Sequence, residues 1–376
     1  MKIQVVDQPR LIHPGGIYIR ANRLFNTTNQ LIAGYATADD NSKALMASVS
    51  LDGGRSWSFR GEVTRVGNPW DHDLDNAFPL QLPSGRILFA FRNHDLHRGR
   101  YTWYRITVCA SDDDGRTWKL QSHVEERKAA AGDHMRNGLW EPFMRVAADG
   151  AVVQLYYSAS VTSRSQYNVM RYSRDGGRTW SGKKIDVSHG PDFWSNNWKD
   201  LSRDGMISIA PRTGKPGELI AIMESTMAET MTYSITTIES DDDGWKWRHN
   251  TSDRSLIYAA HAKKNAGAPG IINVGGTLVA SFMTNEAERT PGIDGGELKF
   301  IVSVDGGKTW SSNGAAKSQD WGAAFTVAGG GVHWPGLCAL NGTHFLALYS
   351  RDGLGAVSQM CRVVPVKKKE LPGGVS

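Results

Sequence analysis

Two glutamates in similar apolar settings are the residues of this chain best suited to acid–base chemistry. Glu141 lies in Leu139-Trp-Glu-Pro-Phe, and Glu224 lies in Ile222-Met-Glu-Ser-Thr. Two facing carboxyl groups can cleave a glycosidic bond, one as nucleophile or base and the other as proton donor. The apolar run before Glu224 would bury its carboxyl, and burial favours the protonated form that a proton donor needs. The pair therefore predicts glycosidase chemistry if the fold brings both carboxyls to one place.

An eight-residue motif, Ser-x-Asp-x-Gly-x-x-Trp, occurs five times, with starts 61, 62, 67 and 63 residues apart. The Asp carboxylate can accept backbone N–H bonds within a tight turn, the Gly supplies a positive φ, and the Trp packs onto a sheet. We interpret the motif as a hairpin staple. Binding of calcium or sugar by these Asp residues is the alternative, which suits a turn repeated around a ring less well. The copies are Ser50–Trp57, Ser111–Trp118, Ser173–Trp180, Ser240–Trp247 and Ser303–Trp310.

Six hairpins alternate with these motifs. Each has an apolar strand, a turn containing Gly or Asn and a second apolar strand, so one unit holds four strands. The 376 residues therefore predict an all-β fold, a single domain over residues 1–376 built as a six-bladed β-propeller with four-stranded antiparallel blades. Residues 2–6 would complete the last blade and close the ring, which removes exposed sheet edges. The hairpins cover residues 19–35, 75–92, 140–157, 204–224, 267–283 and 333–349.

Two rows of residues are expected at one mouth of the ring, because the first strand of a hairpin starts where its second strand ends. Their residue types differ from unit to unit, whereas the staples hardly change, and this difference predicts a site. Strand ends that lie in water and tolerate any residue are the alternative. One row is Arg20, Asn76, Glu141, Asp204, Gly267 and His333, and the other is Arg92, Tyr157, Glu224, Met283 and Tyr349.

We expect catalytic roles for Glu141, Glu224 and Tyr349, whose hydroxyl could orient one carboxylate. Trp140 is either a stacking platform for a sugar or part of the core. Cleavage from a chain end would need a blocked mouth, for which residues 71–75 and 188–198 are candidate loops; they could equally be plain surface. The residues expected to bind substrate are Arg20, Asn76, Arg92, Trp140, Tyr157, Asp204, His333 and Trp334.

Composition argues against several function classes. The net charge is +5, but Lys and Arg are spread along the chain apart from residues 367–369, so we expect no nucleic-acid partner. No apolar run approaches the ~20 residues of a membrane-spanning helix. Three cysteines lack metal-ligand spacing, and we expect no metal, no cofactor and a monomer. The first residues lack the apolar core of a signal peptide, which fits either a cytosolic chain or a mature form with an added start Met, whereas sequons at Asn26, Asn250 and Asn341 favour a secreted glycoprotein.

The five repeats and the strand Ile17-Tyr-Ile-Arg-Ala-Asn resemble the sialidase superfamily of Asp-box propellers over nearly the whole chain. The segments starting at Asp73 (Asp-Leu-Asp-Asn-Ala-Phe-Pro), Phe91 (Phe-Arg-Asn-His-Asp) and Asn137 (Asn-Gly-Leu-Trp-Glu-Pro-Phe) look most similar to the exo-1,5-α-L-arabinanases of glycoside hydrolase family 93. That resemblance implies a secreted enzyme that releases arabinobiose from the non-reducing end of arabinan with retention. It also implies Glu141 as nucleophile, Glu224 as acid/base and an assisting tyrosine, with exchange of the two glutamate roles left open.

Two other functions remain as alternatives. An exo-α-sialidase would need three arginines around the substrate carboxylate. Arg20 suits the first, but the fifth unit offers only Gly267 and Met283, so a neutral furanose chain suits the mouth better. A non-catalytic glycan-binding propeller is the second alternative, because a fold does not determine a function. Two facing acids argue against it.

Overall fold

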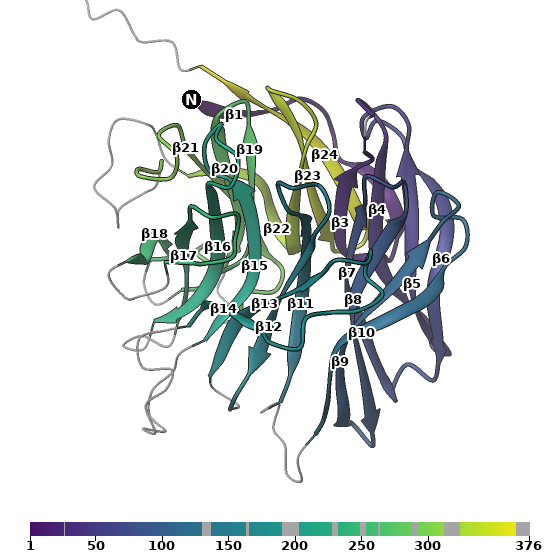
Figure 1. Ribbon diagram of the computed structural model, residues 1–376. Coiled ribbons are helices and arrows are strands. Elements are labelled where there is room, and N and C mark those ends of the chain that lie inside the picture. The colour runs from purple at the N-terminus through teal and green to yellow at the C-terminus, as the bar shows by residue number, and fades with distance from the viewer. Residues whose placement is uncertain are drawn as a thin grey trace, which may run out of the picture.

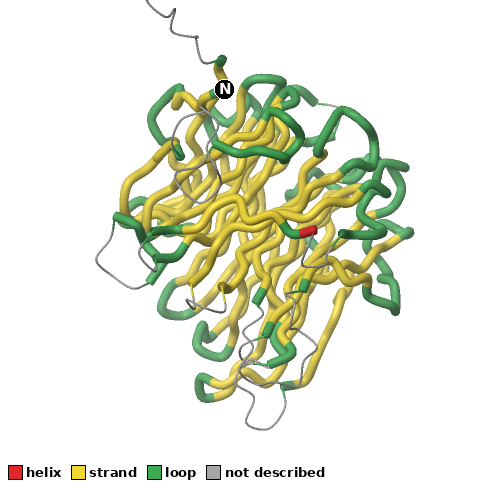
Figure 2. Tube along the Cα trace, turned by 90° about the vertical axis from the view of Figure 1, so that its left-hand side faces the viewer, coloured by secondary structure: helices red, strands yellow, loops and turns green. Residues whose placement is uncertain are grey.

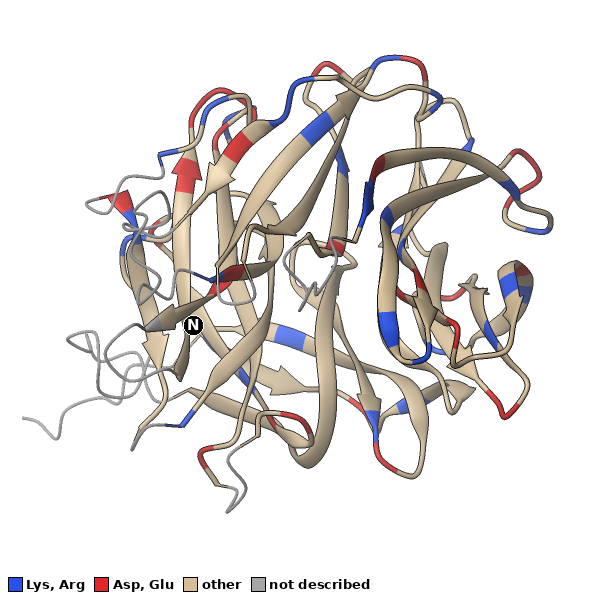
Figure 3. Cartoon of the chain, turned by 90° about the horizontal axis from the view of Figure 1, so that it is seen from below, with Lys and Arg blue, Asp and Glu red and all other residues tan. Residues whose placement is uncertain are grey.

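The computed structural model describes residues 1–25, 27–129, 137–162, 165–189, 203–227, 232–248, 253–261, 264–287, 292–311 and 324–365. The elements named in this part of the chain are all β-strands, connected by turns and loops and by a short helical segment (Figure 2). None of its helices is long and apolar enough to cross a membrane. Seen from below, acidic and basic residues alternate around the molecule and do not gather on one side (Figure 3).

The first sixteen strands after β2 form four antiparallel sheets of four strands each. In each sheet the strands pair in chain order, as the sequence predicts (Figure 1). These strands are β3 (Ile17–Arg23), β4 (Leu31–Ala38), β5 (Ser42–Ser50) and β6 (Ser58–Gly67); β7 (His72–Gln81), β8 (Ile87–His97), β9 (Arg100–Ser111) and β10 (Lys119–Lys128); β11 (Leu139–Val146), β12 (Val153–Ser160), β13 (Gln166–Ser173) and β14 (Ile185–Ser188); β15 (Asp204–Pro211), β16 (Leu219–Met227), β17 (Thr232–Ser240) and β18 (Ser255–Ala259).

The remaining strands form one eight-stranded sheet in which β22 has two partners. Its first part pairs with β21 from Phe325 to Val332, and its second part pairs with β23 from Val332 to Ala339. β1 pairs with β24, which confirms that the N-terminal residues complete the sheet of the C-terminal strands. The strands are β19 (Ala266–Val274), β20 (Thr277–Thr284), β21 (Gly296–Ser303), β22 (Phe325–Ala339), β23 (His344–Arg351), β24 (Gly355–Val364), β1 (Lys2–Val5) and β2 (Arg10–Pro14).

The innermost strands contact each other in a closed series, β3, β7, β11, β15, β19, β22 and back to β3. Apolar clusters fill the spaces between successive sheets, and one of them joins Ile19 and Tyr35 of the first sheet to Leu346 and Met360 of the last. Because the first and last sheets share a core, the sheets surround a common axis as in a β-propeller. This arrangement brings the starts of strands that are far apart in sequence to one place.

The repeated motif forms the expected staple. In the first copy, Asp52 Oδ1 accepts the backbone N–H of Arg55 at 3.0 Å and of Ser56 at 2.9 Å. Its other oxygen accepts the Ser56 hydroxyl at 2.6 Å. Burial acts to raise the pKa of Asp52, but these hydrogen bonds outweigh it and lower the pKa to about 2. The Asp carboxylate is thus occupied by its own turn.

Candidate active site

Each of the six innermost strands contains a β-bulge with one non-glycine residue at positive φ, near the start of the strand or, in β22, near the start of its second part. A non-glycine residue in this left-handed region costs about 1–3 kcal/mol and occurs preferentially at functional sites. We call these six the bulge residues, and they define one mouth of the ring. They are Tyr18 (51°), Asn76 (59°), Glu141 (45°), Met206 (51°), Ala268 (51°) and Trp334 (45°).

The bulges correct the predicted first row. Asn76 and Glu141 are equivalent, as predicted, but Arg20 lies two residues after Tyr18 and Asp204 lies two residues before Met206. Gly267 and His333 each precede their bulge residue by one position. Alignment on the hairpin turns cannot detect these offsets, because turn length varies and a bulge adds a residue that side-chain type does not reveal.

A one-residue slip also changes the second row. The residues paired across from Trp140 and His333 are Ser158 and Ser350, so the neighbouring tyrosines face the other side of their strands. Tyr349 is fully buried and donates to Gln359 Oε1 at 3.0 Å. Tyr157 is also buried and donates to Glu125. The structure therefore places neither Tyr157 nor Tyr349 at the mouth.

Glu141 lines a cavity of about 110 Å³ on the axis, to which all six innermost strands contribute. Its Oε2 atom is buried and has no hydrogen-bond partner among the described residues. Burial raises the pKa of Glu141, and the nearby Glu224 raises it further, against the opposing charges of Arg203 and Arg92. Glu141 is therefore a carboxyl whose pKa lies above its ordinary value and whose Oε2 atom has no hydrogen-bond partner among the described residues.

Glu224, in contrast to Glu141, has a hydrogen-bond partner on each of its two carboxyl oxygens. Its Oε1 accepts from Arg203 Nη1 at 3.0 Å, and its Oε2 accepts the backbone N–H of Ala268 at 2.9 Å. The side chain is nearly fully buried. Two glycines make room for it: a Cβ at Gly267 would lie 2.7 Å from Oε2, and one at Gly205 would lie 3.2 Å from Oε1. Both carboxyl oxygens of Glu224 are thus held in place by hydrogen bonds.

Sequence reasoning missed Arg203 and Tyr18. Arg203 directly precedes the predicted strand, and its guanidinium lies 5.3 Å from the centre of the Tyr233 ring. Tyr18 is buried at the mouth with the Arg20 guanidinium 4.1 Å from its ring centre. Burial raises the pKa of Tyr18, and the charges of Glu141 and Asp75 raise it further while Arg20 opposes them. Tyr18 is thus one tyrosine close to Glu141, and its signal was its place in the motif with Arg20. Tyr233 is another, because burial raises its pKa and the charges of Glu224 and Glu141 raise it further.

Arg92 is at the mouth but already paired. Its Nη2 atom donates to Asp73 Oδ1 at 2.8 Å and lies 3.5 Å from Asp75 Oδ2. The guanidinium also lies 5.4 Å from the ring centre of Trp140. The Trp140 indole is buried and donates to Ser160 Oγ at 2.9 Å, so it packs in the core. The face of its ring contacts the Arg92 guanidinium.

The other predicted residues have varied surroundings. Arg254 forms a two-pronged pair with the buried Asp204, both distances being 2.7 Å. His333 pairs with Asp352 at 2.8 Å.

Asn76 is buried, and its side-chain oxygen has no partner among the described residues. Trp334 packs 6.4 Å from Tyr18 and 5.2 Å from His333 between ring centres, and Arg20 Nη1 donates to the carbonyls of Ile19 and Trp334.

The two candidate loops have different outcomes. Residues 71–75 do not form a free loop, because β7 begins at His72 and its first residues pair with β8. Of residues 188–198, only Ser188 and His189 belong to the described part. Residues 367–369 and the sequons at Asn26 and Asn250 also lie outside the described part, whereas Asn341 lies in an exposed turn.

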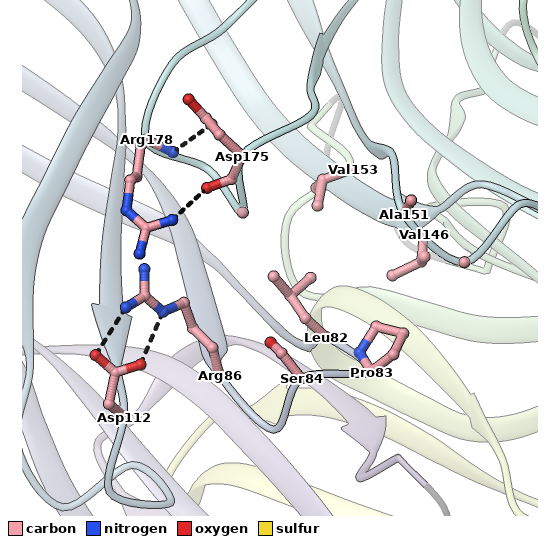
Figure 4. A pocket seen from close by; sticks show the side chains of 12 residues that line it. Leu82, Pro83, Ser84, Arg86, Asp112, Val146, Ala151, Val153, Asp175 and Arg178 are labelled. Carbon is pink, nitrogen blue, oxygen red and sulfur yellow. Dashed lines mark hydrogen bonds and ion pairs between the residues drawn. The ribbon is translucent and has the colours of Figure 1, made fainter.

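A larger cavity of about 470 Å³ shares no lining residue with the mouth. It lies between the β7–β8 turn and the third Asp-box motif (Figure 4). Arg86 pairs there with both oxygens of Asp112, at 2.7 and 2.9 Å, and Arg178 donates to its own motif at Asp175 O. The charged groups of this cavity are hydrogen-bonded within and between the surrounding turns, so we assign no catalytic role to the cavity. The described residues contain no group of three or more His, Cys, Asp or Glu arranged to hold a metal ion.

Comparison with known proteins supports the fold. Residues 171–181 match the BNR/Asp-box repeat family. No curated protein matches the chain in sequence. Similar solved structures include a GH93 α-L-arabinofuranosidase of Fusarium graminearum in complex with arabinobiose (TM-score 0.67, 18% identity, 93% of each chain covered). Another is an α-L-arabinanase of Penicillium chrysogenum complexed with arabinobiose (0.66, 16%, 96% of this chain and 98% of that one). The Trypanosoma rangeli sialidase is similar at 0.56 and 11%, over 93% of this chain and 55% of that one. The chain is therefore an Asp-box β-propeller that shares its fold with an α-L-arabinofuranosidase, an α-L-arabinanase and a sialidase.

Proposed function

We propose that this chain is an exo-acting α-1,5-L-arabinanase that releases arabinobiose from the non-reducing end of arabinan with retention. The observation that carries the proposal is the pair of carboxyls at the mouth, Glu141 with one buried oxygen that has no partner among the described residues and Glu224 paired with Arg203. A retaining glycosidase needs one protonated and one ionised carboxyl. The shared fold with proteins that hold arabinobiose supports arabinan as the substrate.

We also infer that the propeller has six blades. The eight-stranded sheet divides at β22, whose first part serves as the fourth strand of one blade and whose second part is the first strand of the next. The six bulges support this division, because one occurs in each innermost strand, including the second part of β22.

The family resemblance implies Glu141 as nucleophile and Glu224 as acid/base. The charges around the two glutamates favour the opposite assignment. Glu224 is paired with the Arg203 guanidinium and accepts the Ala268 N–H, and a carboxylate held in this way can attack the anomeric carbon. Glu141 has a raised pKa, so it can protonate the leaving oxygen as the glycosyl–Glu224 ester forms. Glu141 then removes a proton from water, which attacks the anomeric carbon and releases the Glu224 carboxylate.

The arginines support a neutral substrate. Arg92 is paired with Asp73 and Asp75, Arg203 is paired with Glu224, and Arg20 donates to two carbonyls. A sialidase would instead direct three arginines toward the carboxylate of its substrate. The charges of two of these arginines are already balanced within the protein, which suits an uncharged sugar.

Product analysis tests the function. Linear arabinan and a sialyl-lactose conjugate are incubated with the wild type, Glu141→Ala and Glu224→Ala, with melting curves as folding controls. Arabinobiose from the wild type alone is expected; sialic acid, or no product from either glycan, would overturn the proposal. An aryl arabinobioside with a good leaving group then separates the roles. Glu141→Ala should still form the Glu224 ester and with azide give the glycosyl azide of retained configuration, whereas Glu224→Ala should be inactive alone and with azide give only the inverted glycosyl azide.

A further inference from the structure

We propose that Trp70 is a distal binding platform for the part of the polysaccharide that remains beyond the bond being cleaved. This inference rests on the proposed function, because it assigns the mouth a polymer that extends out of it. Trp70 lies on the connection between β6 and β7, and its side chain is 78% exposed. Trp70 is the most exposed of the large hydrophobic residues in the part of the chain that the structure describes.

Topology places Trp70 at the mouth. β6 starts next to the Asp-box motif and ends at Gly67, so its end and the start of β7 lie at the opposite end of the blade from the staple. The mouth is at this same end, because the bulge residue Asn76 lies near the start of β7. Trp70 precedes the mouth residue Asp75 by five positions, which limits their Cα separation to about 17 Å.

The turn that carries Trp70 is held by hydrogen bonds on both sides. Asn68 Oδ1 accepts the Trp70 N–H at 3.2 Å, and Asn68 Nδ2 donates to Asp71 Oδ2 at 2.5 Å. Asn68 N donates to Asn41 O at 3.0 Å, and Asp71 O accepts the Leu96 N–H at 2.7 Å. A flat aromatic face on a fixed backbone is pre-organised for ligand contact, because little conformational freedom is lost on binding.

The ligand chemistry follows from the side chain and from the substrate. An indole face stacks on the C–H face of a sugar ring without a charge partner, and Trp has a large rigid surface at low entropic cost. Arabinan cleaved from its non-reducing end leaves the rest of the chain outside the mouth. That outer portion is the occupant we assign to Trp70.

Kinetics on two substrates tests the assignment. We compare linear arabinan with an aryl arabinobioside that is too short to reach Trp70. Trp70→Ala should lower the polymer-to-short ratio of kcat/KM by about 10-fold, which corresponds to about 1.4 kcal/mol. Trp70→Phe should restore most of the ratio. Phe59→Ala is the matched control, because Phe59 is 62% exposed but lies in β6 at the staple end. An unchanged ratio in Trp70→Ala would overturn the proposal.

A binding assay separates this inference from the proposed function. Affinity electrophoresis in gels containing arabinan or other neutral polysaccharides needs no catalysis, so it reports on Trp70 even if the enzyme does not release arabinobiose. Retardation of the wild type and of Phe59→Ala, lost in Trp70→Ala, supports the platform whichever neutral glycan is bound. Equal mobility of Trp70→Ala and the wild type in every gel would refute it.

Discussion

Gly267→Ala is the sharpest test of how the fold positions Glu224. Gly267 has no Cβ, and an added Cβ would lie 2.7 Å from Glu224 Oε2 and 3.0 Å from Ile293 Cδ1. Ordinary contacts begin at 3.4 Å, so the carboxylate must move by about 0.7 Å or the strand must shift. The φ of Gly267 is not in the left-handed region, and the effect of alanine is therefore steric.

The expected magnitude follows from what the displacement breaks. Oε2 accepts the Ala268 N–H, a charge-assisted bond worth about 1.5–3 kcal/mol. If this stabilisation is lost from the carboxylate as it attacks, kcat/KM falls by roughly 10- to 150-fold. A displacement of this size also misaligns the nucleophile, which acts in the same direction.

The assay compares kcat/KM of three glycine variants on arabinan. Gly67→Ala is the matched control, because Gly67 ends β6 and an added Cβ there meets nothing within 4 Å. Gly205→Ala should resemble Gly267→Ala, since its Cβ would lie 2.7 Å from Gln166 and 3.2 Å from Glu224. Wild-type kcat/KM in Gly267→Ala, with an unchanged melting temperature, would refute the idea that these glycines position the carboxylate.

Three further predictions concern Arg203, Glu141 and the two tyrosines Tyr18 and Tyr349. Arg203 lowers the pKa of Glu141, so Arg203→Met should move the alkaline limb of the residual activity to higher pH, and Arg203→Lys should move it less. Burial raises the pKa of Glu141, so its protonated form stabilises the fold below the ordinary carboxyl pKa and this contribution is lost as pH rises through the raised value. Glu141→Gln should remove that loss in melting curves between about pH 4 and pH 8. Tyr349→Phe should lower the free energy of unfolding by about 1 kcal/mol without changing kcat, whereas Tyr18→Phe should lower kcat; the reverse pattern would contradict our placement of the tyrosines.

The repeat made most of the fold predictable. The staples recur with one residue pattern because each turn needs the same hydrogen bonds and the same glycine, as at Gly54 with φ 86°. The strand order within sheets and closure by residues 2–5 follow from that period. The sequence did not show that β22 would be one continuous strand that pairs first with β21 and then with β23.

Residues of the candidate site could be predicted only where their identification did not depend on the exact register of the strand. Glu141 and Glu224 were found because a carboxyl in an apolar strand is unusual whatever its exact position. Tyr349 was misplaced because a strand alternates sides, so an error of one residue moves a side chain from the mouth into the core. Arg203 was missed because its importance lies in a 3.0 Å contact with Glu224, 21 residues away, that no local pattern records.

The bulges explain how a repetitive fold can carry a non-repetitive site. At the staple end each blade uses the same side chains, because those side chains satisfy the same turn. At the mouth the backbone, through the bulge, performs the repeated task of directing one residue toward the axis. Side-chain type is then free to vary, and the six positions hold Tyr18, Asn76, Glu141, Met206, Ala268 and Trp334. Even Ala268 contributes, since its backbone N–H is what the bulge presents to Glu224. Each bulge carries backbone strain of about 1–3 kcal/mol. In return, the backbone fixes the position of the residue at the mouth whatever its side chain is.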